Sequence, residues 1–157
     1  MGIGSAFNYK NFSLSFLIDM RMGGKIYSAT NALAYSRGLH KNTLEGRETG
    51  IGPIEAANVE DYYGRIGGSI TEQFIYDSDF AKLRQVVLSY NLPRSVIQKL
   101  PVSGVSLSVA ARNLAILWKK AENIDPESTY NVSNAQGLEM FGVPSTRTVQ
   151  FNLGVKF

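Results

Sequence analysis

Residues 148–157 read TVQFNLGVKF, and this stretch decides how the rest of the chain is interpreted. Apolar side chains occupy every second position: Val149, Phe151, Leu153, Val155 and Phe157. Polar or small residues stand between them, which is the period-2 pattern of a β-strand with one apolar face and one polar face. Ten such residues at about 3.3 Å each, tilted by about 40°, rise about 25 Å, the height of the apolar band of an outer-membrane β-barrel. The stretch therefore predicts a membrane-spanning strand whose apolar side chains face lipid.

Other parts of the chain show the same alternation, and the expected strands are 2–9, 11–21, 82–92, 104–118 and 147–157. In the fourth strand the alternation changes phase after Arg112, which predicts a β-bulge near Arg112 and Asn113. Two long stretches lack a clean period, and we expect them to be loops, at 22–81 and 119–146. Short and long connections therefore alternate, as periplasmic turns and extracellular loops do in outer-membrane barrels.

The first expected loop contains two short stretches that favour helices. Residues 26–37 place apolar side chains near one helical face, and Gly38 follows them as a terminator. Residues 58–66 offer Asn58 as an N-cap, with two acidic residues in the first turn. We expect a short helix at each place.

Polar and charged side chains in the strands follow the same division into two faces. Those opposite the apolar positions are expected to face the lumen of a barrel: Asp19, Arg21, Arg112, Asn152 and Lys156. Arg84 and Arg147 fall on the apolar positions, but near strand ends, where a long side chain can reach the headgroups. An Arg or Lys in mid-strand on the lipid face would cost about 2–4 kcal/mol. We expect none there.

Composition excludes several classes of protein. Although 44% of the residues are hydrophobic, no run of about twenty apolar residues exists, so a transmembrane helix is excluded. The chain has no cysteine, which excludes disulfides and Cys-ligated metal sites. The net charge is only +3 and the basic residues are scattered along the sequence, which argues against nucleic-acid binding.

Residues with catalytic or metal-binding chemistry lie in the two expected loops, but they form no recognisable site. His40 is the single histidine and is predicted to be a solvated side chain rather than a metal ligand. The spacing of Glu122, Asp125 and Glu127 lacks the EF-hand pattern. A glycosidase needs two carboxyl groups at a defined separation. Nothing in the sequence sets such a separation for the remaining candidates, Glu45, Glu48, Glu55 and Glu60. We predict no catalytic residue, no cofactor and no metal site, and we predict that the chain is not an enzyme.

Some aromatic residues leave two interpretations open. Tyr62 and Tyr63, in the first loop, could stack on a sugar ring of a substrate or pack beneath the loop. Aromatic residues also stand near the strand ends, where they could form the aromatic girdles of a membrane barrel or take part in ordinary strand packing; these are Tyr9, Tyr90, Trp118 and Phe157.

Several stretches carry more than a physical pattern: IYSATNALAYSRG at 26–38, TLEGRETG at 43–50, KLRQVVLSYNLPRSV at 82–96, VSLSVAARNLAILWKKAENIDPE at 105–127 and NAQGLEMFGVPSTRTVQFNLGVKF at 134–157. The most specific pieces are the strand that stops at Leu92-Pro93, the RNL and DPE motifs, and PSTRT before the last strand. Over nearly the whole chain, these stretches resemble the carboxyl-terminal portion of SusC/RagA-type TonB-linked outer-membrane proteins.

That resemblance implies a barrel of about 22 strands with an internal plug, which imports nutrients such as glycans or peptides. It also implies the outer membrane of a Gram-negative, Bacteroidetes-like cell as the location. The implied partners are outer-membrane lipids, a SusD-like surface lipoprotein, an oligosaccharide or peptide substrate, and TonB, which would contact an amino-terminal part outside this chain. The alternating apolar residues of 148–157 further resemble the terminal signal that the barrel-assembly machinery recognises.

We therefore expect residues 1–157 to be a C-terminal fragment of a TonB-dependent receptor barrel domain. Its fold class would be all-β: antiparallel strands of a large transmembrane β-barrel, with long extracellular loops carrying short helices. The alternative is a soluble β-sandwich that serves as a carbohydrate-binding or interaction module. The two differ in where the apolar face points, because a sandwich packs that face into its own core.

Overall fold

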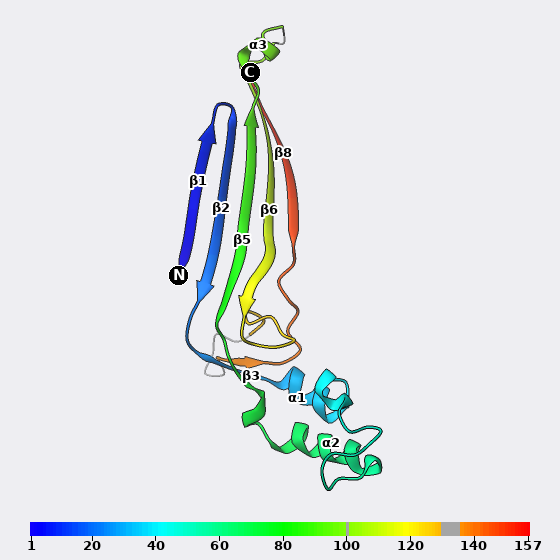
Figure 1. Ribbon diagram of the computed structural model, residues 1–157. Helices are drawn as coiled ribbons and strands as arrows, with labels where there is room; N and C mark the ends of the chain where they lie inside the picture. The colour runs from blue at the N-terminus through cyan, green and yellow to red at the C-terminus, as the bar shows by residue number, and fades with distance from the viewer. Residues whose placement is uncertain (100, 130–135) are drawn as a thin grey trace. The chain divides into compact units, whose positions relative to one another are not determined.

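The structure is a computed structural model that describes residues 1–99, 101–129 and 136–157 (Figure 1). Leu100 and residues 130–135 of the expected loop 119–146 lie outside the described residues. The chain divides into two compact units. We call the first the strand unit, which comprises Met1–Met22, Phe80–Lys119 and Ser145–Phe157. The second, the loop unit, comprises Gly23–Asp79 and Lys120–Pro144.

The strand unit is a single antiparallel sheet. Its members are β1 (Gly2–Tyr9), β2 (Phe12–Arg21), β5 (Phe80–Asn91), β6 (Gly104–Lys119) and β8 (Thr148–Lys156). They lie side by side in the order β1-β2-β5-β6-β8 (Figure 1). A short helix, α3 (Arg94–Ile97), follows β5 at the end of the sheet. The sheet of the strand unit thus has five antiparallel strands, as the alternation predicts, and β5 begins two residues before the expected 82.

The strand register explains why alternation along each strand becomes two distinct faces of the sheet. Directly paired residues share a face, and one row across the sheet runs from Tyr9 through Phe12, Tyr90 and Leu107 to Leu153. The next row that shares this face pairs Phe7 with Leu14 and continues in the same manner. The apolar positions of all five strands therefore gather on one face.

Irregularities near the loop end of the sheet change which residues share a face. Asn113 has a φ of 51°, and the pairing shifts between Leu83 and Gln85, so the predicted bulge near Arg112 and Asn113 is confirmed. The same shift takes Arg84 off the apolar positions, and its guanidinium Nη2 lies 2.6 Å from the Asp19 carboxylate. The expectation that Arg84 shares the apolar face is therefore wrong, because a bulged residue does not obey the period of two.

The loop unit combines a small sheet with helices. The sheet has the order β4-β3-β7, formed by β3 (Lys25–Ser28), β4 (Ile75–Asp77) and β7 (Leu138–Glu139). The helices are α1 (Ala29–Ser36) and α2 (Val59–Ser69), and short 3-10 turns are η1 (Lys41–Leu44), η2 (Ala56–Asn58) and η3 (Glu72–Phe74). The helix expected at 26–37 is therefore a strand followed by a shorter helix, while the one expected at 58–66 extends to Ser69.

The loop unit has its own apolar core. Helices α1 and α2 pack together through a buried cluster of Ala32, Tyr35, Val59, Tyr63 and Phe74. Gly67 permits this close approach, because a Cβ there would lie 2.5 Å from the carbonyl oxygen of Ala32. Within the described part of the chain, no helix is long and apolar enough to cross a membrane.

Candidate functional site

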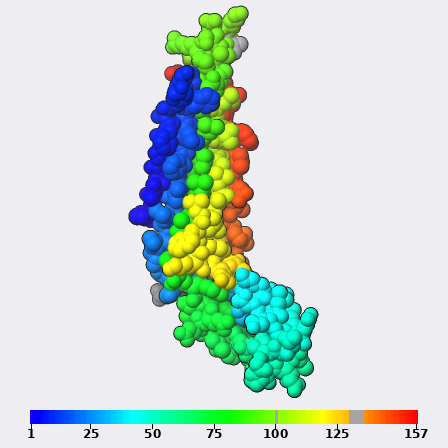
Figure 2. Space-filling view, viewed as in Figure 1, coloured from blue at the N-terminus to red at the C-terminus, as the bar shows by residue number. Residues whose placement is uncertain are grey.

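The apolar face of the sheet is exposed along its whole length. On β8 the relative exposures are 51% for Val149, 80% for Phe151, 67% for Leu153 and 43% for Val155. These four residues pair with Ala111, Val109, Leu107 and Val105, and so lie on the shared apolar face. Phe157 follows the last residue of β8 and is 89% exposed. Figure 2 shows one face of the strands in space-filling form, from β1 in blue to β8 in red.

The opposite face of the sheet is polar and lined by small residues. The register places all five residues predicted to face a lumen on this side: Asp19, Arg21, Arg112, Asn152 and Lys156. Small partners stand beside them, since Asn152 is paired with Ser108 and Lys156 with Gly104. This face therefore leaves room for water or solute above the strands.

A polar network links neighbouring strands on this side. The Arg84 guanidinium donates to Asp19 at 2.6 Å and to the Asn113 Oδ1 at 3.2 Å. The Asn113 amide in turn donates to the carbonyl oxygen of Thr146 at 3.0 Å. The network thus runs from β2 through β5 and β6 to the residues that precede β8. These hydrogen bonds provide partners for the Arg84 side chain, which the bulge brings to the polar face.

No apolar layer of the strand unit covers its apolar face. The two buried apolar clusters among the described residues are both made of loop-unit residues. A β-sandwich buries the inner faces of two sheets against each other. Here the sheet presents its apolar face outward, as a barrel wall in lipid does.

The surroundings of Tyr62 and Tyr63 in the loop unit bear on the two interpretations left open for these residues. Tyr63 is only 7% exposed, and its hydroxyl donates to the carbonyl oxygen of Glu45 at 3.2 Å. Burial raises the pKa of the Tyr63 hydroxyl, and the nearby Glu45 carboxylate adds to the effect. This geometry favours packing beneath the loop for Tyr63. The Tyr62 ring is half-buried against Tyr63, with centroids 5.2 Å apart, and lines a cavity of about 510 Å³ with Asn42.

His40 differs from the sequence-based expectation of a solvated side chain, because it is 4% exposed. Its Nδ1 accepts the Asn42 backbone N–H at 3.2 Å, and its Nε2 lies 2.6 Å from the Asn123 side-chain amide. The ring also packs against Tyr35, with centroids 4.6 Å apart. Burial lowers the pKa of His40, partly opposed by the Glu122 carboxylate. His40 therefore joins the two segments of the loop unit, and its burial favours the neutral ring.

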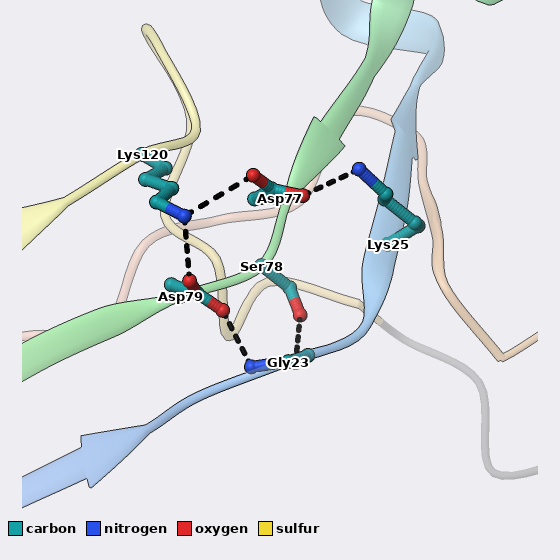
Figure 3. A network of polar contacts seen from close by, with 6 residues as sticks. All are labelled: Gly23, Lys25, Asp77, Ser78, Asp79 and Lys120. Carbon is teal, nitrogen blue, oxygen red and sulfur yellow. Dashed lines mark hydrogen bonds and ion pairs between the residues drawn. The ribbon is translucent and has the colours of Figure 1, made fainter.

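A second polar cluster joins the same two segments of the loop unit, Gly23–Asp79 and Lys120–Pro144 (Figure 3). We call it the clasp: Gly23, Lys25, Asp77, Ser78, Asp79 and Lys120. The Lys120 ammonium lies 2.9 Å from Asp79 and 3.2 Å from Asp77, and Lys25 lies 2.5 Å from Asp77. The Gly23 N–H donates to Asp79 at 2.6 Å.

Electrostatics hold the clasp in its charged form. The hydrogen bond from Lys120, followed by that from the Gly23 N–H, lowers the pKa of Asp79. Hydrogen bonds from Lys25 and Lys120 lower the pKa of Asp77, and the two carboxylates raise the pKa of Lys120. The Asp77 and Asp79 carboxylates therefore stay charged to a lower pH than their ordinary pKa of 3.8 implies, and the Lys120 ammonium to a higher pH than its ordinary pKa of 10.5 implies.

Sequence reasoning also missed a buried carboxylate. Glu139 is 1% exposed and accepts from the Ser28 hydroxyl at 2.7 Å and the Thr30 hydroxyl at 2.6 Å. These partners lie more than 100 positions apart in the chain, so no local pattern could have indicated the pairing. Like His40 and the clasp, Glu139 connects the two segments of the loop unit.

One of the carboxylates considered as metal ligands, Asp125, has a structural role. The Asp125 Oδ1 accepts the backbone N–H of Glu127 at 3.0 Å, as in a local turn. Among the residues that the structure describes, no three His, Asp or Glu side chains gather as a metal site would require.

Comparisons with known proteins give relatives that are much longer than this chain. No family model matches it. Over its whole length the chain is 27% identical to the TonB-dependent receptor P3 of Formosa agariphila, of which it covers 16%. Solved structures of the RagAB peptide importer in the open-open state and of the RagAB peptide transporter align with 99% of the chain, each with a TM-score of 0.72, at 18% and 19% identity. The aligned region is 17% of each RagAB chain.

These similarities bear on the sequence-based predictions. The resemblance to TonB-linked outer-membrane proteins of the SusC/RagA type is confirmed. The predicted fold class, antiparallel strands of a large β-barrel with short helices in the loops, is also confirmed. The relatives are named as a receptor and a peptide importer, in keeping with the prediction that the chain is not an enzyme.

Proposed function

We propose that this chain is part of the barrel of a TonB-dependent importer of nutrients such as glycans or peptides in an outer membrane. Residues 1–157 would form a C-terminal segment of the barrel domain, with the apolar face of the sheet against lipid and the polar face toward the lumen. The observation that carries the proposal is the exposed apolar face, continuous over all five strands. The similarity of the whole chain to a TonB-dependent receptor supports the same assignment.

The two units would then have different parts in transport. The strand unit would supply wall and lumen lining, with the turn between β1 and β2 and helix α3 on the periplasmic side. The loop unit, inserted between β2 and β5 and between β6 and β8, would stand on the extracellular side. Its half-buried Tyr62, at a cavity of about 510 Å³, is the proposed substrate-contacting aromatic.

The partners follow from the same assignment. A SusD-like surface lipoprotein would act with the barrel on the extracellular side, and TonB would act through an amino-terminal part of the complete protein. Energy coupling therefore belongs to those parts, and the contribution of this chain is passive. The proposed location is the outer membrane of a Gram-negative, Bacteroidetes-like cell. The similar RagAB structures are those of a peptide importer, which supports a peptide as one substrate class.

Two adjacent substitutions on β8 test the proposal. Leu153→Arg places a charge on the proposed lipid face, at a cost of about 2–4 kcal/mol near the membrane midplane, and should block assembly of the complete barrel protein into outer membranes. Asn152→Arg, one residue away on the opposite face, should assemble as the wild type does. Heat-modifiable migration of the folded barrel on gels measures assembly. Equal tolerance of the two changes would contradict the proposal and favour the soluble interaction module.

A further inference from the structure

The charges of the chain are divided very unevenly between its two units. The strand unit holds ten Lys and Arg residues and a single acidic one, Asp19. The loop unit holds six basic and twelve acidic residues. The net charge of +3 for the whole chain conceals this difference. The sheet is therefore strongly basic for its size.

Some of these cations stand at the end of the sheet where the short connections lie. Lys10 occupies the turn between β1 and β2, and Arg94 and Lys99 lie in the connection between β5 and β6. The Asn11 side chain donates to the Asn91 carbonyl oxygen at 2.8 Å, which holds the first turn beside the start of the second connection. We call this region, with its three cations, the turn end.

The cations of the turn end lack acidic side chains as neighbours. All three side chains are exposed, and no salt bridge joins them to a carboxylate among the described residues. The sequence has no Asp or Glu between 1 and 18, between 80 and 121, or between 145 and 157. An anion can therefore approach the turn end without competing for an existing ion pair.

Beside these cations lies an aromatic part of the apolar face. The Lys10 ammonium lies 5.5 Å from the centroid of the Tyr9 ring, so this charge is on the apolar side of the sheet. Tyr9 pairs with Phe12, whose ring lies 4.4 Å from that of Tyr90. Phe12 and Tyr90 then line a depression of about 380 Å³ that continues toward Phe151. Cation, aromatic row and apolar groove thus follow one another along the face.

We propose that the turn end binds an anionic phospholipid of the periplasmic leaflet. The lipid phosphate lies at Lys10, with Arg94 and Lys99 adding to the attraction, and an acyl chain follows the groove past Phe12 and Tyr90. Exposed cations without Asp or Glu side chains nearby favour phosphatidylglycerol over the zwitterionic phosphatidylethanolamine, whose ammonium finds no acidic side chain there. The inference rests on the proposed function, because it needs the apolar face to lie in lipid.

The test uses the complete barrel protein in nanodiscs that contain equal amounts of phosphatidylglycerol and phosphatidylethanolamine. Native mass spectrometry measures which lipids remain bound after the bulk lipid is removed. We expect wild-type protein to retain phosphatidylglycerol at least about fivefold in excess, the preference that one Lys or Arg near an anionic surface supplies. The triple variant K10Q/R94Q/K99Q should bring the ratio close to one.

A matched control removes the same amount of charge elsewhere. Arg37, Lys41 and Arg65 are exposed cations of the loop unit, and the variant R37Q/K41Q/R65Q should keep the wild-type lipid ratio. Inorganic phosphate at millimolar concentration is the second control, because it carries the headgroup charge without an acyl chain. It should leave the bound phosphatidylglycerol in place.

Each outcome separates this inference from the proposed function. Assembled protein that retains the two lipids equally, or a turn-end variant that keeps the wild-type preference, would overturn the lipid site and leave the membrane assignment standing. Complete displacement by inorganic phosphate would also overturn it, since the groove would then contribute nothing. Wild-type protein that fails to enter the nanodiscs would contradict the proposed function and this inference together.

Discussion

The strand unit and the loop unit place the same kinds of side chain in opposite surroundings. In the loop unit, large apolar residues form two buried clusters, with Ile26 at 1% and Phe74 at 0% exposure. In the strand unit most of them are exposed or half-buried, although Phe80 and Ile97 are buried, and Phe151 keeps 80% of its surface exposed. Soluble proteins rarely expose apolar patches beyond a few hundred Å². The contrast indicates that the loop unit folds around its own core, whereas the sheet needs an apolar surrounding to be stable.

Among changes within the loop unit, the largest expected effect on this contrast is at Gly67. In Gly67→Ala the new Cβ would lie 2.4 Å from the Ser36 nitrogen and 2.5 Å from the Ala32 oxygen, which should destabilise the loop unit by about 1–3 kcal/mol. Hydrogen exchange of the α1 and α2 amides in the complete protein measures the change. The strand amides should keep their wild-type protection.

Gly68→Ala is the matched control for that substitution. Nothing lies within 4 Å of a Cβ at Gly68, so the change should be neutral or stabilising by up to about 1 kcal/mol through helix propensity. If both alanine variants lost protection equally, the close approach of α1 and α2 at Gly67 would not be the cause. If strand amides lost protection as much as helix amides, the two units would not be independent.

A second, smaller effect should follow pH and affect the loop unit alone. Burial lowers the pKa of His40 below its ordinary 6.5, so the folded unit favours the neutral ring and the unfolded chain binds the proton more readily. This contribution to stability is present above about pH 6.5 and is lost as the pH falls from there through the lowered pKa. Protonated Nδ1 could no longer accept the Asn42 N–H.

Hydrogen exchange of the loop unit at pH 7.5 and pH 5 should reveal this loss in the wild type. His40→Asn retains a side-chain oxygen that can cap η1 but does not titrate, so its protection should change little between the two pH values. An equal pH dependence in this variant would assign the effect to other groups.

The smallest expected effect concerns the strand unit alone. The Asp19 and Arg84 side chains keep 36% and 27% of their surface exposed, and such partly solvated pairs contribute about 1 kcal/mol or less. A double-mutant cycle with Asp19→Asn and Arg84→Gln, measured by urea unfolding from lipid vesicles, should give a coupling of that size. A coupling above about 3 kcal/mol would mean that the polar face is dry rather than facing an aqueous lumen.

Local periodicity predicted the sheet because the period of two is a property of neighbouring residues. Along β8 the alternation from Val149 to Val155 matches the observed faces. Arg84 was assigned to the wrong face because the bulge depends on pairing across strands, which a single strand does not display.

The loop unit was harder to predict because its contacts join distant segments. Strand β3 pairs with residues about 50 and 110 positions away, and its sequence alone favours a helix. His40 was expected to be solvated, yet its partner Asn123 comes from the second segment of the unit, 83 positions later. The pairing of Lys120 with Asp79 in the clasp is of the same kind. Residue spacing carries no signal for such contacts.

The most direct test of the central claim is a cysteine scan of β8 in the complete protein, with any cysteine outside this chain first replaced by serine, since the chain itself has none. A nitroxide attached at each position from 149 to 155 reports its access to oxygen, which concentrates in lipid, and to a water-soluble nickel chelate. We predict oxygen access at Val149, Phe151, Leu153 and Val155, and chelate access at Gln150, Asn152 and Gly154. Chelate access at every position, or no alternation, would contradict the account.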